Sequence, residues 1–178
     1  MIVVGLLTVR DRSSVVEVAR RAAAAGAKVE VVGVVPGDAA WDRVLYELTA
    51  AHVGHATVVR SAKDSMEPAD LDLALRYLPD IRAVVVLQPP AAVLPTAIAG
   101  ADFAGATLVI VGPLDGGSAA ALEAGAGSTP PIVLDPPAHD PDGTFAGFVA
   151  RLATRLDAGD APEAAFRETV SALAVDPA

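Results

Sequence analysis

Short runs of apolar residues alternate along this chain with longer stretches that carry apolar residues at helical spacing. Residues 2–7, 82–87 and 107–111 are almost wholly apolar, as is typical of strands buried on both faces of a parallel sheet. Between such runs, Trp41 and Leu48 belong to a set of apolar residues that recurs on one face of a predicted helix. This alternation predicts an α/β fold with helices covering both faces of the sheet.

The same patterns, with the turn and capping residues between them, place each element along the chain. Strands are predicted at residues 2–7, 28–35, 55–60, 82–87, 107–111 and 131–134. Helices are predicted at residues 13–26, 38–53, from 68 onward, 92–104, 118–124, 143–157 and 161–174. We therefore expect one domain over residues 1–178, a three-layer α/β/α sandwich around a mostly parallel sheet with Rossmann-like topology.

Composition narrows the chemistry that this fold can carry. Hydrophobic residues make up 53% of the chain and aromatic residues only 4%, so the core is expected to consist of Ala, Val and Leu. Cysteine is absent, which excludes disulfides, thiolate metal sites and a cysteine nucleophile. The net charge of -9 disfavours nucleic acid and anionic membrane surfaces as partners. Residues 1–9 are too short to span a bilayer and lack a basic lead-in, so a cytoplasmic location is expected.

Polar residues that follow the predicted strands are the candidates for ligand binding, because ligands of such folds bind at the carboxyl ends of parallel strands. Arg10 is the most informative of them, since it is a cation at a strand end of an acidic chain. It could hold a carboxylate or phosphate of a small metabolite, but a salt bridge with Asp11 or Glu17 is favoured. Other members of this group follow later strands, among them Gly37, Asp38 and Gln88.

Two further stretches carry suggestive residue types without a specific spacing. His139, with Asp135, Asp140 and Asp142, has the donor atoms of a divalent metal site, but solvated acidity explains this Pro-rich segment better. Residues 112–117 are rich in glycine but lack the Lys-Ser/Thr ending of a phosphate loop, so a turn is favoured there.

Residues 140–145, Asp-Pro-Asp-Gly-Thr-Phe, resemble the Gly-Ala-Gly-Asp-Thr-Phe motif of the ribokinase-like (PfkB-type) carbohydrate kinases. In that family the glycine amides form an anion hole and the Asp is the general base that activates the sugar hydroxyl. Aligned on Thr144, this chain places Gly143 at the position of the base. Asp140, Pro141 and Asp142 stand at the positions of Gly, Ala and Gly.

Other segments fit the same family in chain order, and several departures accompany them. Gly5 in the opening strand and residues 31–38, which end in Val-Val-Pro-Gly-Asp, resemble family patterns. Arg10 stands where the family places a sugar-binding Asp, and Ser13, Ser14 and Glu17 stand at its Gly-Gly pair and Asn. The Asn-x-x-Glu motif, which organises Mg²⁺ and phosphate in the family, and the β-lid that often mediates dimers have no recognisable counterpart. The resemblance therefore implies a shortened ribokinase-like protein.

The substituted motif is unfavourable for a triphosphate on physical grounds. Pro141 removes one backbone N–H, and Asp140 and Asp142 bring negative charge to the point where phosphate would bind. The same carboxylates are favourable at a helix N-terminus, so a cap over residues 142–144 is the favoured interpretation. The alternative is that Asp142, next to the position of the base, acts as a shifted catalytic Asp.

The favoured hypothesis is a catalytically impaired ribokinase-like protein that binds a small sugar- or nucleoside-like metabolite or acts as a regulatory module, with no cofactor expected. The alternative is an ATP-dependent carbohydrate or nucleoside kinase that uses ATP, Mg²⁺ and catalytic Asp142. The predicted ligand-binding residues are Arg10, Asp11, Glu17, Gly37, Asp38, Gln88, Gly143 and Thr144. A homo-oligomer is also expected, because a shortened parallel sheet leaves an edge or an apolar face to cover.

Overall fold

The computed structural model of the whole chain describes residues 1–8, 12–63, 65–114, 116–125 and 127–175. Its centre is a six-stranded sheet, parallel throughout, with the strand order β3-β2-β1-β4-β5-β6. The strands are β1 (Ile2–Leu7), β2 (Val29–Val35), β3 (Gly54–Arg60), β4 (Ala83–Leu87), β5 (Thr107–Val111) and β6 (Ile132–Leu134). Every predicted strand is present, and its bounds lie within a residue or so of the expected ones.

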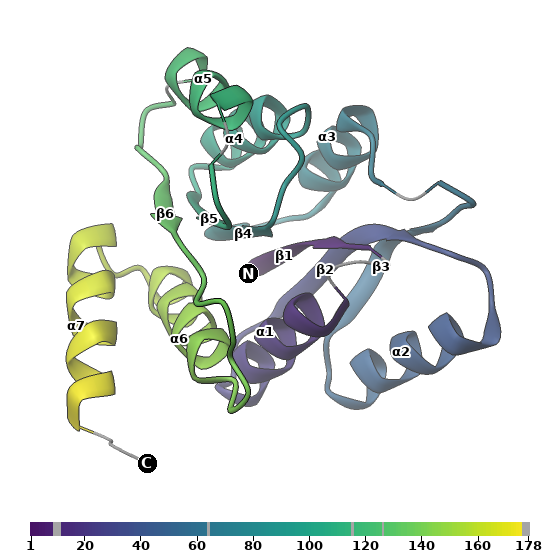
Figure 1. Cartoon of the computed structure of the whole chain (residues 1–178), viewed down its shortest axis with the longest axis horizontal. Helices are drawn as coiled ribbons and strands as arrows, with labels where there is room; N and C mark the ends of the chain where they lie inside the picture. The colour runs from purple at the N-terminus through teal and green to yellow at the C-terminus, as the bar shows by residue number, and fades with distance from the viewer. Residues whose placement is uncertain (9–11, 64, 115, 126, 176–178) are drawn as a thin grey trace.

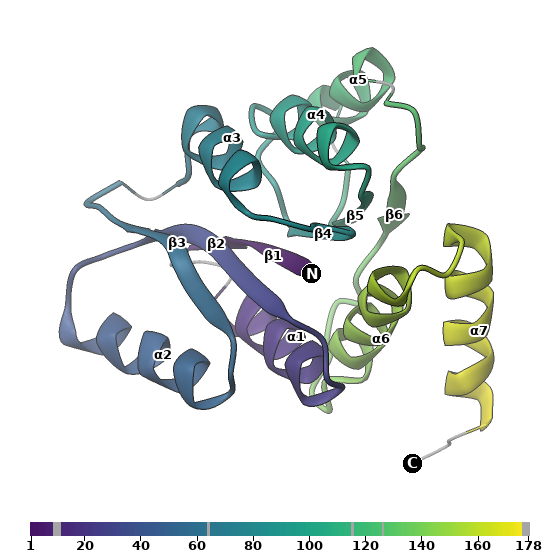
Figure 2. The same ribbon diagram turned by 180° about the vertical axis from the view of Figure 1, so that it is seen from behind.

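Helices follow the strands as the alternating pattern predicts. They are α1 (Arg12–Ala24), α2 (Ala39–Ala50), α3 (Pro68–Tyr77), α4 (Leu94–Ala104), α5 (Gly116–Ala124), α6 (Thr144–Ala158) and α7 (Pro162–Val175). Helices α1, α2, α6 and α7 lie on one side of the sheet and α3, α4 and α5 on the other (Figures 1 and 2). The predicted three-layer α/β/α sandwich is therefore confirmed.

Each face of the sheet has its own core of mainly aliphatic side chains. Alternate strand residues point to opposite faces, so Val4 and Val85 join the core under α1 and α6. Val3 and Val84 join the core under α3 and α4. Strands β1, β4 and β5 are buried almost completely, which explains why their sequences are continuously apolar.

The chain crosses to opposite faces after the two central strands. Strand β1 leads into α1 on one face, whereas its neighbour β4 leads into α4 on the other (Figure 1). Such a reversal opens a crevice at the carboxyl ends of the two strands, where open α/β sheets bind their ligands. The topology therefore directs attention to the ends of β1 and β4, at Thr8 and Gln88.

A close approach of two strands shapes the sheet near this crevice. The pairing of β1 with β2 shifts in register between Val4 and Leu7. A Cβ atom on Gly33 would lie only 2.2 Å from the carbonyl oxygen of Leu7. Only glycine fits there without displacing backbone, which accounts for the Gly in the middle of an otherwise branched strand.

Helix α7 is attached mainly through α6. The ring of Phe166 meets that of Phe148 edge to face at 5.8 Å, and Ala165 is fully buried. Arg155 of α6 pairs with Asp160 and Glu168 at 2.9 and 2.5 Å. None of the helices in the part of the chain that the structure describes has the length and apolarity to cross a membrane.

Candidate ligand site

An inner pocket of about 320 Å³ opens at the carboxyl ends of β4 and β5, between the first turns of α1 and α6. Polar and apolar atoms share its wall about equally, and Ser14, Gln88 and Asp140 are the lining residues with polar side chains. The residues that line it are Ser14, Val18, Leu87, Gln88, Val111, Pro136, Pro137, Ala138, Asp140, Phe145, Ala146 and Val149. A pocket with apolar side chains and a few polar ones at this edge of the sheet is the expected form of a small-molecule site.

A second, more polar hollow adjoins the inner pocket. This outer pocket of about 310 Å³ lies between α1 and the loop before α6. It is lined by Ser13, Ser14, Glu17, Arg21, Asp140, Pro141, Asp142 and Gly143. Ser14 and Asp140 line both pockets, so the two hollows meet at these side chains.

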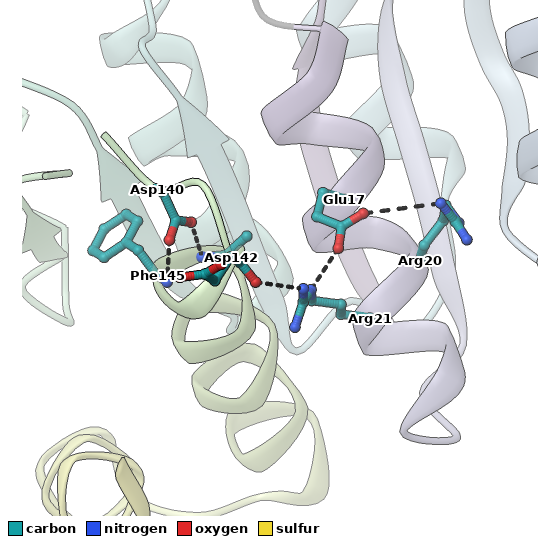
Figure 3. Close-up of polar contacts among 7 residues, drawn as sticks. Glu17, Arg20, Arg21, Asp140, Asp142 and Phe145 are labelled. Carbon is teal, nitrogen blue, oxygen red and sulfur yellow. Dashed lines mark hydrogen bonds and ion pairs between the residues drawn. The ribbon is translucent and has the colours of Figure 1, made fainter. Parts of the chain in front are cut away.

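The N-terminus of α6 is occupied by a carboxylate from the chain itself. Both oxygens of Asp140 accept backbone hydrogen bonds, from the amides of Phe145 and Ala146, each at 3.0 Å (Figure 3). The first four amides of a helix have no partner within the helix, and its dipole favours negative charge beside them. Asp140 therefore satisfies two of the donors that a bound anion would otherwise use.

The N-cap residue of α6 is Gly143, which has no side chain to accept a hydrogen bond from the helix amides. Its φ of 66° lies in the left-handed region that favours glycine. The helix start thus falls within the predicted cap at residues 142–144, and of the two carboxylates expected to favour it, Asp140 accepts the helix amides. Asp142 contributes its backbone carbonyl, which accepts a hydrogen bond from Arg21 at 3.3 Å.

Arg21 of α1 holds the opposite side of the outer pocket. Its Nε donates to Glu17 at 2.6 Å, and Glu17 also lies 3.9 Å from Arg20 (Figure 3). A Cβ atom on Gly143 would lie 2.5 Å from Nη2 of Arg21. The space into which a side chain at position 143 would extend is therefore filled by the guanidinium of Arg21.

These residues do not fit a triphosphate as they stand. Two amides of the α6 N-terminus are bonded to Asp140, and Pro141 has no N–H to offer. The described residues contain no group of three or more His, Asp or Glu side chains placed to hold a metal ion. A phosphate that used these two amides would have to displace the carboxylate of Asp140.

Gln88 is a predicted ligand residue that lines the inner pocket. It directly follows β4 and has a φ of 47°, an uncommon value for a residue with a side chain. Its backbone N–H donates to the carbonyl of Val111 at 2.7 Å. Such left-handed residues cluster at functional sites, where the surrounding structure enforces them.

The remaining predicted ligand residues are distributed more widely. Glu17 and Gly143 line the outer pocket, while Thr144, the first residue of α6, lines neither pocket. Gly37 precedes α2, and Asp38 caps that helix by accepting from the amides of Ala40 and Trp41. Arg10 and Asp11 lie outside the described residues.

Two of the residues that form the site carried little signal in the sequence. The sequence marked the carboxylate of Asp140 as favourable at a helix N-terminus without giving the amides that it binds, and it did not single out Val18. The signal for Asp140 is the combination of an Asp, a Pro and a Gly just before an apolar helix, which allows a loop to fold back on that helix.

Comparison with known proteins supports the fold and leaves the activity open. No family model matches the chain, and no curated protein matches it. Among solved structures, the protein Sa239 superposes with a TM-score of 0.66 at 16% identity, over 93% of this chain and 82% of that one. A PfkB protein from Polaromonas sp. JS666 gives 0.60 at 16% identity, over 86% and 81%. A fructokinase with bound ATP from Xylella fastidiosa gives 0.61 at 12% identity, over 88% and 77%.

At identities this low, the superpositions show a shared fold and nothing more. The chain thus has the ribokinase-like fold that its motifs predicted, in a short form of 178 residues.

Proposed function

We propose that this chain is a ligand-binding protein of ribokinase-like fold in which phosphoryl transfer is impaired. The observation that carries the proposal is the carboxylate of Asp140 at the N-terminus of α6. A helix N-terminus stabilises phosphate through free amides, and here a built-in anion takes two of them. Bound phosphate would have to displace Asp140 and would be repelled by its charge.

The position of the family's general base supports the same proposal. Gly143 has no side chain, and Arg21 fills the space beside it. A carboxylate at that position would also need a left-handed backbone. Asp142, the candidate for a shifted base, lies on the outer pocket and is not among the residues that line the inner one.

The inner pocket suits a small metabolite that carries hydroxyl groups. Its hydroxyl, amide and carboxylate groups, from Ser14, Gln88 and Asp140, offer both donors and acceptors, and its other lining residues have apolar side chains. Each oxygen of Asp140 accepts one amide and keeps further acceptor capacity. A structural neighbour is a fructokinase, which favours a sugar-like ligand over other hydroxyl compounds.

The test is a thermal-shift screen of the whole chain against sugars, nucleosides, ATP and ADP, with and without Mg²⁺. A sugar or nucleoside at about 100 times its dissociation constant is expected to stabilise the fold by about 2.7 kcal/mol, without ATP or Mg²⁺. The variant Ser14→Trp, which fills the junction of the two pockets, should lose this stabilisation. Ser171→Trp, at an exposed position on α7, should retain it.

The kinase alternative predicts different results in the same experiment. Stabilisation by ATP that depends on Mg²⁺, followed by phosphate transfer to a sugar or nucleoside, would overturn the impaired-kinase proposal. Asp142→Asn should then abolish turnover while leaving the melting temperature unchanged. Turnover that survives this substitution would exclude Asp142 as the base.

A further inference from the structure

Three exposed hydrophobic side chains gather on α3 and α4, on the side of the sheet opposite to α1 and α6 (Figure 1). Tyr77 is 78% exposed, Phe103 72% and Leu73 57%. A single exposed apolar residue is ordinary, but a cluster that contains two of a chain's few aromatic residues needs an explanation. We call these three residues, together with the neighbouring Asp72 and Arg76 of α3, the α3–α4 patch.

The patch is continuous across the two helices. Leu73 and Tyr77 are four residues apart on α3, so they project from the same side of that helix. The guanidinium carbon of Arg76 lies 5.6 Å from the centre of the Phe103 ring on α4, which joins the two helices at the surface. Helices α3 and α4 lie side by side on the outside of the sheet in both views (Figures 1 and 2).

The charged pair in the patch is only partly satisfied within the chain. The Nε atom of Arg76 donates to both carboxylate oxygens of Asp72, at 2.9 and 2.8 Å. Guanidinium carries five N–H donors, and the four on its terminal nitrogens have no hydrogen-bond acceptor within the described residues. A second carboxylate in front of the patch would therefore find a preformed partner.

We propose that the α3–α4 patch binds the same patch of a second copy of this chain about a two-fold axis. The charge pattern on α3 is self-complementary, because it places an acid and a base one helical turn apart. When two α3 helices cross in opposite directions, Asp72 faces Arg76 of the second copy, and Leu73 faces Tyr77 of the second copy. The midpoint of Asp72 and Arg76 and the midpoint of Leu73 and Tyr77 lie one residue apart along α3. A single two-fold axis can therefore bring both pairs into contact.

The size of the patch suits the centre of such an interface. An aromatic side chain buries about 150–250 Å² when it is fully covered. Two rings that are about three-quarters exposed, with Leu73, thus supply roughly half of the about 800 Å² per partner of a stable interface. Tyr and Arg are also the residue types that most often dominate binding energy at interface centres. This inference does not depend on the ligand of the inner pocket.

The test is sedimentation equilibrium at physiological salt, over a range of protein concentrations. The unmodified chain is expected to dimerise, and Tyr77→Ser should weaken the dimer at least tenfold. The matched control is Tyr46→Ser on α2, which removes an equally exposed tyrosine (74%) from the other side of the sheet and should change nothing.

Charge reversal tests the two-fold pairing directly. Arg76→Asp alone and Asp72→Arg alone should each be monomeric, because like charges then face each other across the axis. An equimolar mixture of the two variants should recover a heterodimer, in which every facing pair is again opposite in sign. A monomeric unmodified chain at its highest soluble concentration would overturn the proposal. So would single reversals that remain dimeric, or a mixture of folded variants that fails to associate.

Discussion

The N-termini of α2 and α6 are both capped by an aspartate, and the two caps are built differently. At α2 the N-cap residue Asp38 itself accepts the amides of the second and third helical residues, each at 3.0 Å. At α6 the amides at the equivalent positions go to Asp140, which precedes the N-cap Gly143 in the loop. The same two backbone amides are therefore bound by the N-cap residue at α2 and by a residue of the preceding loop at α6.

Asp38 has a role only in the helix that it caps, whereas Asp140 also holds the loop before its helix in place. Asp38 stabilises α2 and leaves the shape of the surrounding surface unchanged. Asp140 also closes the loop between itself and the first turn of α6, and residues on both sides of it, Ala138 and Phe145, line the inner pocket. A cap supplied from a loop therefore shapes a cavity, and at the same time it withdraws the helix amides from any incoming anion.

The largest effect is expected from the glycines next to these caps. Gly143→Ala places a side chain at a φ of 66° and against Arg21, so unfolding in urea should show a loss of about 1–2 kcal/mol. Gly37→Ala, next to Asp38, meets nothing within 4 Å and should stay within about 0.5 kcal/mol of the parent. Equal losses at the two positions would mean that the α6 cap is no more constrained than the α2 cap.

Removal of the capping carboxylates is expected to have a smaller and similar effect at both helices. Asp38→Ala and Asp140→Ala should each lower the free energy of unfolding by about 1 kcal/mol, because each leaves two helix amides without an acceptor. Asp142→Ala serves as the matched control, since only its backbone carbonyl is engaged. A loss at Asp142 as large as at Asp140 would contradict the assignment of the cap.

Inorganic phosphate should distinguish the two uncapped variants. In Asp140→Ala the freed amides face the pockets, so phosphate at its dissociation constant should restore about 0.4 kcal/mol in the same unfolding experiment. Asp38→Ala frees amides outside both pockets and should respond as weakly as the parent. A phosphate response in the parent protein would show that Asp140 does not exclude anions.

A carboxylate away from any helix N-terminus gives the smallest predicted effect. Hydrogen bonds from the side chain and backbone of Ser128 lower the pKa of Asp102 from its ordinary value of 3.8. A depressed pKa contributes stability that is present above the ordinary value and lost as the pH falls through the folded-state value. Acid titration should therefore narrow the stability difference between the parent and Asp102→Asn, and a constant difference would contradict this assignment.

The elements of the fold could be predicted because the sheet is buried on both faces. Strands such as β4 contain only apolar residues, and Asp38 stands where a helix cap is expected. The α6 cap could not be predicted in the same way. Its acceptor, Asp140, lies three residues before the N-cap Gly143, and the loop between them contains the left-handed Gly143. Capping preferences apply to the N-cap residue itself and do not predict an acceptor further back in the loop.

The contacts that shape the outer pocket join residues far apart in the sequence. Arg21 reaches the carbonyl of Asp142 across the packing of α1 against α6, and this contact defines the space beside Gly143. Sequence patterns predict the two helices, but they do not predict how far one is shifted along its axis relative to the other. Of the predicted ligand residues, Gln88, Glu17 and Gly143 line the two pockets, and that they bind a ligand stays a prediction.

The attachment of α7 has a consequence for how the molecule opens. Because α7 packs mainly on α6, it forms the outermost cooperative unit of its layer and can detach without exposing the sheet. Its backbone amides should exchange with deuterium sooner than those of β1 or β4. Since α6 also carries a wall of the inner pocket, a ligand that steadies α6 should slow exchange in α7, although no residue that lines the pocket belongs to that helix.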